Sequence, residues 1–495
     1  MIDKKNISKE SFDIIICGGG PSGSMAAIAA AREGSNVLLI EQYAFLGGTL
    51  TAMGVGPMMT FHNNVGEQVV LGYPDELIER LKAKGASPGH IEDVITYCST
   101  ITPFDSEALK IELEDMVTEA GGTILYHTIL VDVVVEDGKV KSIIAANKNG
   151  LVEYRADFFI DSTGDGDLAK MAGLTFKSGR DTDGLMQPLT MNLKVANVDR
   201  KKVKEYARKY PERCLFDYGK EEGLRRLETA PRISLKGYIP ELKEARKRGE
   251  VSVPREFVLL FETGTLGVFI LNMSRIQGLD GTDPYELSQA EMIGRKQCVE
   301  IFNFLKKYCE GFENCVRMDT SAQVGVRETR RIDGHYTITE EDIISASIPE
   351  DTIALGGYPI DIHSPDKVET NSVFFKKGTV YGVPLRSLVP KGISNLLING
   401  RCIDATHEAL AAIRVTPQLM AVGQGAGTVA HLCVNQNKSP LDIDIKELRL
   451  KLQENGALVD VPKSFFMFSE DFGKDEVLDD QNQFIFSDSN SEEDK

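Results

Sequence analysis

Residues 13–41 read DIIICGGGPSGSMAAIAAAREGSNVLLIE, and this stretch decides the fold of the chain. A β-branched apolar run, Ile14–Cys17, is followed at once by three spaced glycines and then by an alanine-rich segment, Ser24–Glu33, that favours a helix. A glycine ends that helix, and Asn36–Ile40 forms a second apolar run that leads into Glu41. Short apolar runs of this kind are typical of buried parallel strands. We therefore predict a strand–turn–helix–strand unit within an α/β fold.

The spacing of the glycines predicts the ligand of this unit. Gly18 permits a tight turn, Gly20 lets the backbone approach a pyrophosphate, and Gly23 lets the helix pack closely on the strand. The N-terminus of the helix then offers free N–H groups and a partial positive charge to the phosphates. Glu41 follows where a carboxylate can accept hydrogen bonds from ribose hydroxyls. The unit predicts an adenine dinucleotide; the alternative is a glycine-rich loop that serves packing only.

A second glycine turn indicates which dinucleotide binds. Glu41 is followed by Gly47-Gly48-Thr49, and this spacing resembles FAD-binding folds of the glutathione-reductase type rather than NAD dehydrogenases. Further along, Leu130–Glu136 and Val140–Ala146 flank an Asp-Gly turn and predict a β-hairpin, the start of a β-meander,. We therefore expect FAD rather than NAD as the cofactor.

Composition excludes several classes of function. A formal charge of −18 over 495 residues argues against nucleic-acid binding and against docking on an anionic membrane,. No apolar run reaches the roughly 18 residues that a membrane span needs, and the first ten residues lack the apolar region of a secretory signal,. The eight cysteines show no CxxC pattern, so we expect reduced thiols and a cytoplasmic protein,.

The chain divides into segments of different character. We expect a Rossmann-like FAD-binding domain built from residues 12–175 and 376–440, so that both chain ends contribute to it. Residues 176–375 alternate charged helical segments, expected over 201–210, 238–249 and 284–309, with apolar strand candidates, and predict a mixed sheet-and-helix substrate domain,. A C-terminal packing segment is expected over residues 441–468, and the acidic residues 469–495 are expected to form a disordered tail. Acids alternate over residues 161–167, but the further glycine and terminal Glu of a calcium loop are missing, and we predict no metal,.

The closing segment of the first domain is the second informative stretch. A strand is expected over residues 395–398, followed by a loop through His407 and an apolar helix over 419–434 that carries Gly423-x-Gly425-x-Gly427. The N-terminus of that helix could point free N–H groups at the pyrimidine ring of a flavin. The glycines could equally allow close packing on the sheet, and both interpretations can hold together.

Six motifs together resemble the bacterial FAD-dependent oxidoreductases of the glutathione-reductase-2 superfamily, which is PHBH-like with a single FAD domain. They are CGGGPSGSMAA, EQYAFLGGT, DSTGDGD, VGVRETRRI, GYPIDIH and NGRCIDATHEALAAIRVTPQLMAVGQGAG. The resemblance spans residues 13–430 and implies one tightly bound FAD. The cofactor-binding residues that follow from it and from the last helix are Gly18, Gly20, Ser22, Gly23, Glu41, Gly47, Gly48, Thr49, Leu130, Thr163, Gly164, Gly400, Arg401, Arg414, Thr416 and Gln418.

Three side chains are candidates for catalysis beside the flavin. An arginine can hold an anionic or carbonyl oxygen, and a histidine can exchange a proton near neutral pH. His407 is the first candidate because its loop closes onto the flavin, and His363 and Arg327 come next. For each, a structural role as a satisfied interior side chain is the alternative.

The resemblance implies an FAD-dependent oxidoreductase that transfers a hydride between flavin N5 and a small polar organic substrate, by dehydrogenation or reduction. No second GxGxxG unit occurs, so a separate electron acceptor or donor is expected. A flavin monooxygenase-type enzyme and a non-redox protein with structural FAD are the alternatives. The absence of tryptophan disfavours a halogenase. The resemblance does not specify the substrate.

Overall fold

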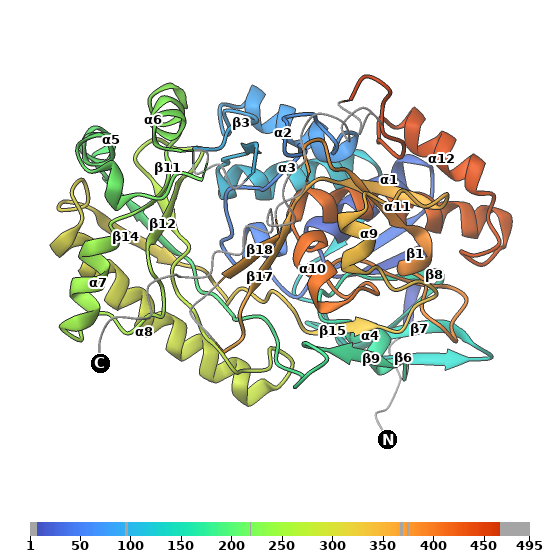
Figure 1. The fold of residues 1–495 in the computed structure, drawn as a ribbon. Coiled ribbons are helices and arrows are strands. Elements are labelled where there is room, and N and C mark those ends of the chain that lie inside the picture. Colours follow the sequence, from blue (N-terminus) through green and yellow to red (C-terminus); the bar gives the residue numbers. More distant parts are fainter. Residues whose placement is uncertain (1–6, 95–97, 218, 367–369, 374–375, 466–495) are drawn as a thin grey trace.

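The structure is a computed structural model, and it describes residues 7–94, 98–217, 219–366, 370–373 and 376–465. Two lobes lie side by side in Figure 1. The larger lobe combines the N-terminal residues with those near residue 400, and the smaller lobe is built from the middle of the chain. The acidic tail predicted over 469–495 lies outside the described residues. The predicted domain boundaries stay predictions.

The larger lobe is organised around a seven-stranded sheet whose order is β5-β2-β1-β8-β7-β6, with β20 also paired to β8. The pairs β5–β2, β2–β1, β1–β8 and β8–β20 are parallel, whereas β6, β7 and β8 form an antiparallel meander. The strands are β1 (Ile7–Cys17), β2 (Val37–Ile40), β5 (Thr123–Leu125), β6 (Ile129–Glu136), β7 (Lys139–Asn147), β8 (Gly150–Asp161) and β20 (Leu396–Ile398). This arrangement confirms the predicted α/β class, the meander and the strand supplied from the C-terminal part of the chain.

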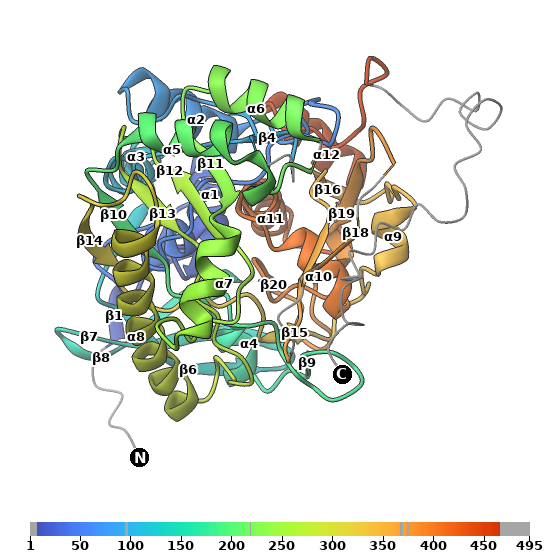
Figure 2. The same ribbon diagram turned by 60° about the vertical axis from the view of Figure 1, so that its left-hand side comes forward.

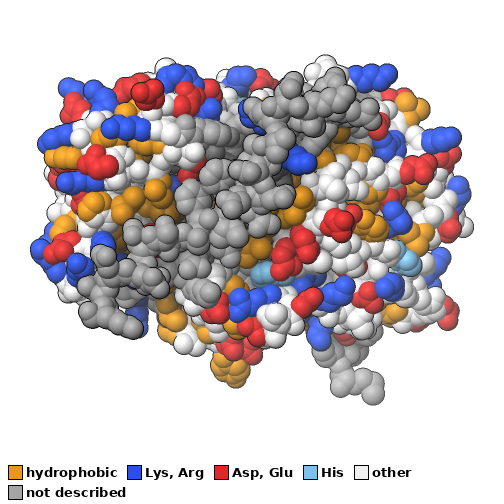
Figure 3. All heavy atoms as spheres, in the orientation of Figure 1, with side chains coloured by type: hydrophobic (Ala, Val, Ile, Leu, Met, Phe, Trp, Pro, Cys, Tyr) orange, Lys and Arg blue, Asp and Glu red, His pale blue; other side chains and the backbone are white. Residues whose placement is uncertain are grey.

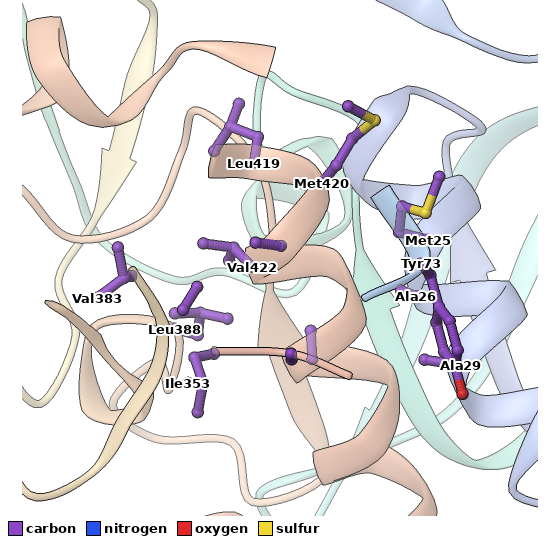
Figure 4. Close-up of a cluster of buried hydrophobic side chains, with 14 of the residues drawn as sticks. Met25, Ala26, Ala29, Tyr73, Ile353, Val383, Leu388, Leu419, Met420 and Val422 are labelled. Carbon is purple, nitrogen blue, oxygen red and sulfur yellow. The ribbon is translucent and has the colours of Figure 1, made fainter. Parts of the chain in front are cut away.

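Two helices, α1 (Pro21–Arg32) and α11 (Thr416–Gln436), pack against each other beside this sheet. In Figure 4, Met25, Ala26 and Ala29 of α1 face α11, while Ile353 and Val383 lie on its other side. A Cβ at Gly423 would overlap the carbonyl oxygen of Ser22, and one at Gly427 would overlap that of Ala26. The close approach of the two helices therefore requires these glycines, and their partner is α1 rather than the sheet.

The smaller lobe contains a five-stranded antiparallel sheet of order β11-β12-β13-β10-β14. Figure 2 brings its helices α7 and α8 forward. The elements are β10 (Leu193–Ala196), β11 (Ser234–Gly237), β12 (Val258–Glu262), β13 (Phe269–Leu271), β14 (Val316–Thr320), α5 (Arg200–Lys209), α6 (Lys220–Thr229), α7 (Ile239–Lys247) and α8 (Pro284–Tyr308). Its core is separate and includes Leu193, Leu235, Leu260 and Phe269. The predicted helices over 201–210, 238–249 and 284–309 are confirmed, whereas α6 was not predicted.

Shorter elements connect the lobes and cover the larger sheet. The remaining helices are α2 (Tyr73–Ala83), α3 (Ser106–Glu119), α4 (Asp167–Met171), α9 (Glu340–Ile344), α10 (His407–Ile413) and α12 (Ile445–Glu454), with short 3₁₀ turns η1 (Gly48–Leu50), η2 (Pro211–Arg213) and η3 (Leu385–Ser387). Two-stranded pairs are β3 (Ile91–Glu92) with β4 (Thr100–Ile101), β9 (Phe176–Ser178) with β15 (Arg330–Ile332), β16 (Thr352–Gly356) with β19 (Tyr381–Pro384), and β17 (Ile360–His363) with β18 (Thr370–Val373).

Charged side chains of both signs are interspersed over the face shown in Figure 3. Within the described ranges, we find no helix with the length and apolar character required to cross a membrane.

Candidate cofactor and substrate cavity

A cavity of about 680 Å³ is lined by residues of both lobes. From the larger lobe it receives the turn after β1, the end of β2, the loop after β8, and the start of α11. From the smaller lobe it receives residues of β11 and β12 and of the segment just before β10. Cofactor and ligand pockets in proteins span about 300–1,000 Å³. The cavity is therefore large enough for a sizeable ligand, and both predicted halves of the site open into it.

The first glycine turn forms one end of the cavity. Gly18 has a φ of +102°, and a Cβ there would overlap the backbone of Ser162. A Cβ at Gly20 would meet no atom within 4 Å, so at this point the backbone faces open space. Among the described residues, no side chain caps the N-terminus of α1. Its N–H groups and partial positive charge are therefore available to an anionic ligand such as a diphosphate.

Glu41 lies directly after β2 and lines the cavity, although its side chain is buried. Its two carboxylate oxygens accept hydrogen bonds from the backbone N–H groups of Gly19, at 2.7 Å, and Tyr43, at 2.9 Å. Burial raises the pKa of this carboxyl, and the backbone N–H bonds oppose that rise. Each carboxylate oxygen has a second lone pair, so Glu41 can still accept from a ribose hydroxyl.

The second glycine turn is tied to the first. Gly47 and Gly48 both adopt positive φ, at +101° and +43°, and the N–H of Gly47 donates to the carbonyl oxygen of Gly19 at 2.8 Å. Gly48 and Thr49 line the cavity, while Gly47 lies behind its wall. A side chain on Gly47 would meet Thr51. The turn therefore places backbone rather than bulky side chains beside the cofactor space.

The acidic loop after β8 is held by Asp161. This buried carboxylate accepts from the N–H and hydroxyl of Thr163, at 3.1 and 2.7 Å, and from the N–H of Ala169 at 2.9 Å. Burial raises the pKa of Asp161 to about 6. In the same loop, Asp165 pairs with Arg401. These contacts give the alternating acids a structural role in shaping the cavity wall.

A second helix N-terminus, that of α11, opens into the cavity beside Arg414. Val415, Thr416 and Leu419 line the wall there, and none of the described side chains caps the helix. Two helix N-termini thus face the same space, which favours a ligand with negative charge at more than one point.

The part of the wall near Arg414 carries further ionisable side chains. Arg327 donates from Nη1 to the carbonyl oxygen of Pro188, at 2.6 Å, and to Oγ1 of Thr190, at 2.5 Å. Nε2 of His363 lies 3.3 Å from Oδ2 of Asp361. Burial lowers the pKa of His363 well below its ordinary value, and nearby Arg327 lowers it further. His363 is therefore neutral near pH 7.

Most of the predicted site residues meet at this cavity. The predicted residues that line it are Gly18, Gly20, Ser22, Glu41, Gly48, Thr49, Leu130, Thr163, Gly164, Gly400, Arg401, Arg414, Thr416, His363 and Arg327. Four predicted residues lie behind the wall: Gly23, Gly47, Gln418 and His407.

The residues behind the wall contact the interior. Gly23 packs on Gly18, and the amide of Gln418 bonds to the hydroxyl of Tyr381 at 2.7 Å. Nδ1 of His407, at the start of α10, lies 2.7 Å from Oε2 of Glu328. Glu328 also pairs with the buried guanidinium of Arg331. His407 therefore touches the loop that carries Arg327 rather than the cavity itself.

Some cavity residues were missed by the sequence analysis. Arg255 lies in an irregular segment before β12, Tyr358 follows the Gly356-Gly357 pair, and Asp361 stands in the Asp-x-His pair of β17. Of these three residues, only Asp361 could have been predicted from the sequence. Side chains alternate along a strand, so residues 361 and 363 point to the same face, and a candidate site at His363 implies Asp361 as well. Nothing in the local sequence around Arg255 distinguishes it from a surface arginine.

The fold and the cavity together define an α/β protein with a dinucleotide site. The family described as FAD dependent oxidoreductase matches residues 13–452. The chain belongs to this family, and FAD is its cofactor. The predicted resemblance to FAD-dependent oxidoreductases is thereby confirmed.

More distant similarities cover only parts of other proteins. Digeranylgeranylglycerophospholipid reductase of Thermoplasma volcanium is 26% identical over 180 residues, which are 33% of this chain and 42% of that protein. Thiamine thiazole synthase of Methanococcus vannielii is 28% identical over 177 residues, which are 32% of this chain and 62% of that protein. The chain thus matches less than two thirds of the length of either relative.

Solved structures share the fold only loosely. A geranylgeranyl bacteriochlorophyll reductase-like protein of Thermoplasma acidophilum has a TM-score of 0.42 at 14% identity, with 90% of this chain and 84% of that chain covered. A flavin-dependent brominase has a TM-score of 0.47 at 13% identity, with 90% and 83% covered. Neither similarity is close enough to indicate an activity.

Proposed function

We propose that the protein transfers a hydride between N5 of FAD and a small polar organic substrate, as a dehydrogenase or a reductase. The proposal depends on one observation: a single cavity is lined by two helix N-termini, by a glycine turn, and by the side chains of Arg327 and His363. When bound, FAD supplies the two-electron hydride chemistry. The protein then has to hold both partners, exclude water and manage the accompanying proton.

The residues at the larger lobe fit the parts of FAD. We propose that the turn from Gly18 to Gly20 and the N-terminus of α1 bind the diphosphate, and that Glu41 accepts from the ribose. Thr49 and Thr416 also line the cavity. The free N–H groups at the start of α11 would stabilise negative charge on a bound ring system.

His363 is the proposed proton-transfer group. It lines the cavity, it is neutral near pH 7, and Asp361 beside its Nε2 stabilises the protonated ring. A neutral imidazole can take up the proton that leaves the substrate in a dehydrogenation, and it can return that proton in a reduction. Arg327, close enough to influence the His363 pKa, is proposed to hold an oxygen of the substrate.

His407 is proposed as a positioning residue. Through Glu328 it supports the loop of Arg327 from behind the cavity wall. His407→Gln is expected to keep FAD and to reduce turnover by up to about 100-fold, because small displacements of a binding group are costly. The KM should rise while the visible spectrum of bound FAD stays unchanged. Loss of FAD in this variant would show that His407 only maintains the fold.

A complete catalytic cycle needs a second electron partner. Each dehydrogenation moves two electrons and one proton to the cofactor and a second proton to the protein or solvent. An electron acceptor then has to restore the oxidised cofactor. A reduction needs an electron donor instead. We propose a separate acceptor or donor, because only one GxGxxG unit occurs in the sequence. The eight cysteines, all buried and free of disulfides, support a reducing, cytoplasmic location,.

The test uses the purified protein with FAD bound. Under anaerobic conditions it is mixed with panels of small polar alcohols, amines, saturated acids and unsaturated acids, and the visible absorbance of oxidised flavin is followed. Bleaching by one panel supports dehydrogenation. For a reductase, dithionite-reduced protein should regain the absorbance with an unsaturated acceptor. Failure of both experiments would favour structural FAD, and oxygen incorporated into a product would indicate a monooxygenase.

A further inference from the structure

Four arginines from distant parts of the chain converge at the substrate side of the cavity. Arg255 precedes β12, Arg275 follows β13, Arg327 lies in the loop before β15, and Arg414 ends α10. Arg255, Arg327 and Arg414 line the cavity. Arg275 is buried beside them and donates from Nη2 to the carbonyl oxygen of Ser364 at 3.0 Å.

Their charges are close enough to act on one another. Burial lowers the pKa of Arg327, and Arg414, Arg255 and Arg275 lower it further. Burial and Arg275 lower the pKa of Arg255 to about 10, so that this group is still a cation at neutral pH. Clustered, buried cations are unfavourable, and an anion placed among them offsets that repulsion.

The carboxylates nearby are fewer than the arginines. Asp361 acts on Arg255, Arg275 and Arg327, while Glu256 acts on Arg275. Another cation on the cavity wall, Lys236, is paired with Asp217 at 3.1 Å. Over the described residues, these four guanidinium groups outnumber the two carboxylates that act on them, so this part of the wall is positive in a chain whose formal charge is −18.

The hydrogen bonds of the arginines leave donors for a ligand. Arg414 donates from Nη2 to the carbonyl oxygen of Asp361 at 3.2 Å, and its buried Nε has no hydrogen-bond partner within the described part of the chain. Among the described residues, Arg327 makes two side-chain hydrogen bonds, both from Nη1. Each guanidinium has five N–H donors in a planar fork that matches the two oxygens of a carboxylate.

We propose that Arg255, Arg327 and Arg414 bind a carboxylate group of the substrate, so that the substrate is a small organic acid. The inference rests on the proposed function and specifies its substrate class. Phe257, Leu259 and Phe261 line the same part of the cavity and provide an apolar surface for the carbon skeleton of such an acid. The combination favours an organic carboxylate over inorganic phosphate, which has no apolar part.

The experiment measures binding rather than turnover. Protein with FAD bound is titrated at constant ionic strength with acetate, succinate, benzoate and inorganic phosphate. Changes in the visible spectrum of the flavin and the heat of binding are recorded. At least one carboxylate should bind more tightly than phosphate. Arg255→Met and Arg327→Met should each weaken its binding about 10- to 100-fold, because each removes a charge-assisted hydrogen bond.

Controls separate a binding role from a structural one. Arg317→Met removes an exposed arginine of β14 in the same lobe and should leave the affinity within about twofold, as expected of a surface change,. Arg327→Lys should recover part of the affinity, because it restores the charge without the fork. FAD content and Tm of every variant are compared with the parent. An equal loss of affinity in Arg317→Met would overturn the proposal, and so would phosphate binding more tightly than every carboxylate.

The outcome also distinguishes the two proposals. Carboxylates that bind but neither bleach nor reoxidise the flavin would contradict the proposed redox function and leave the anion site standing. Redox turnover of a neutral compound, without carboxylate binding, would support the proposed function and overturn the anion site. Absence of binding by every probe would likewise overturn the anion site.

Discussion

Two parts of the cavity wall are built in different ways. Around the turn at Gly18–Gly20, the turn at Gly47–Gly48 and the starts of α1 and α11, backbone groups form much of the wall. Around Arg255, Arg327 and His363, the wall consists of charged and aromatic side chains that come from separate segments. A cofactor can be held by backbone geometry that short sequence motifs specify, whereas recognition of a substrate here depends on side chains brought together by the fold.

The first prediction tests whether the cofactor side depends on backbone contact. Gly423→Val should destabilise the protein by about 3 kcal/mol and abolish FAD binding, because the side chain would overlap the carbonyl oxygen of Ser22 in α1,. The measurements are Tm and the ratio of FAD to protein. Gly425→Ala is the comparison with a smaller clash on another side of the helix, since the three atoms nearest to its added methyl belong to the side chain of Ile353, the closest at 2.9 Å. Similar losses in both variants would contradict the role of the helix contact.

The second prediction concerns pH and Asp161. Since its pKa is raised from 3.8 to about 6, the native protein holds a proton that the unfolded chain has released between those values. Stability from this group is therefore lost as pH rises from about 4 to 6, by about 3 kcal/mol in total at 1.4 kcal/mol per pKa unit. Asp161→Asn removes this titration, so its Tm deficit relative to the parent should shrink over that range.

A matched variant gives the reference for that measurement. Asp157→Asn replaces an exposed carboxylate on the same strand and reports the general effect of an Asp-to-Asn change. A Tm deficit of Asp161→Asn that grows as pH rises from 4 to 6 would show that the carboxyl is stabilised in its charged form.

The third prediction separates cofactor binding from folding. Gly20→Ala should leave the Tm of the FAD-free protein nearly unchanged, since the added methyl meets no protein atom within 4 Å and the φ of −66° suits alanine. FAD affinity should fall about tenfold or more, because the methyl enters the space for the diphosphate. Fluorescence titration with FAD gives the Kd. Unchanged affinity would show that the diphosphate lies elsewhere.

The smallest effect is expected for an ionic side chain of the cofactor lobe. Arg32 on α1 makes a two-pronged ion pair with Glu76 on α2, at 2.6 and 2.8 Å, and both side chains are partly exposed. Arg32→Gln should cost at most about 1 kcal/mol, as partly solvated ion pairs do, and should leave FAD affinity unchanged. This small effect contrasts with the loss of carboxylate affinity, about 10- to 100-fold, expected when Arg255 or Arg327 is replaced. A large loss of FAD would show that side chains matter on the cofactor side as well.

The sequence by itself determined the part of the cavity that is proposed to bind the cofactor. Ile14–Cys17, the glycines at 18 and 20 and the acid at Glu41 are neighbours along the chain, and their spacing restricts the backbone to a strand, a turn and a helix. The meander after Leu130 was equally predictable, because alternation and a turn signal are local properties.

Only the tertiary structure decided the part of the cavity that is proposed to bind the substrate. Arg255 and Arg414 are far apart in the sequence. The motif around Arg414 predicted a contact with the cofactor rather than with Arg327, and no local pattern around Arg255 marks a site. The sequence also did not show that His407 contacts Glu328 instead of lining the cavity, because no motif spacing links these two residues. Local spacing fixes backbone conformation over a few residues, whereas the meeting of distant side chains depends on how two lobes pack, which is a property of the whole chain.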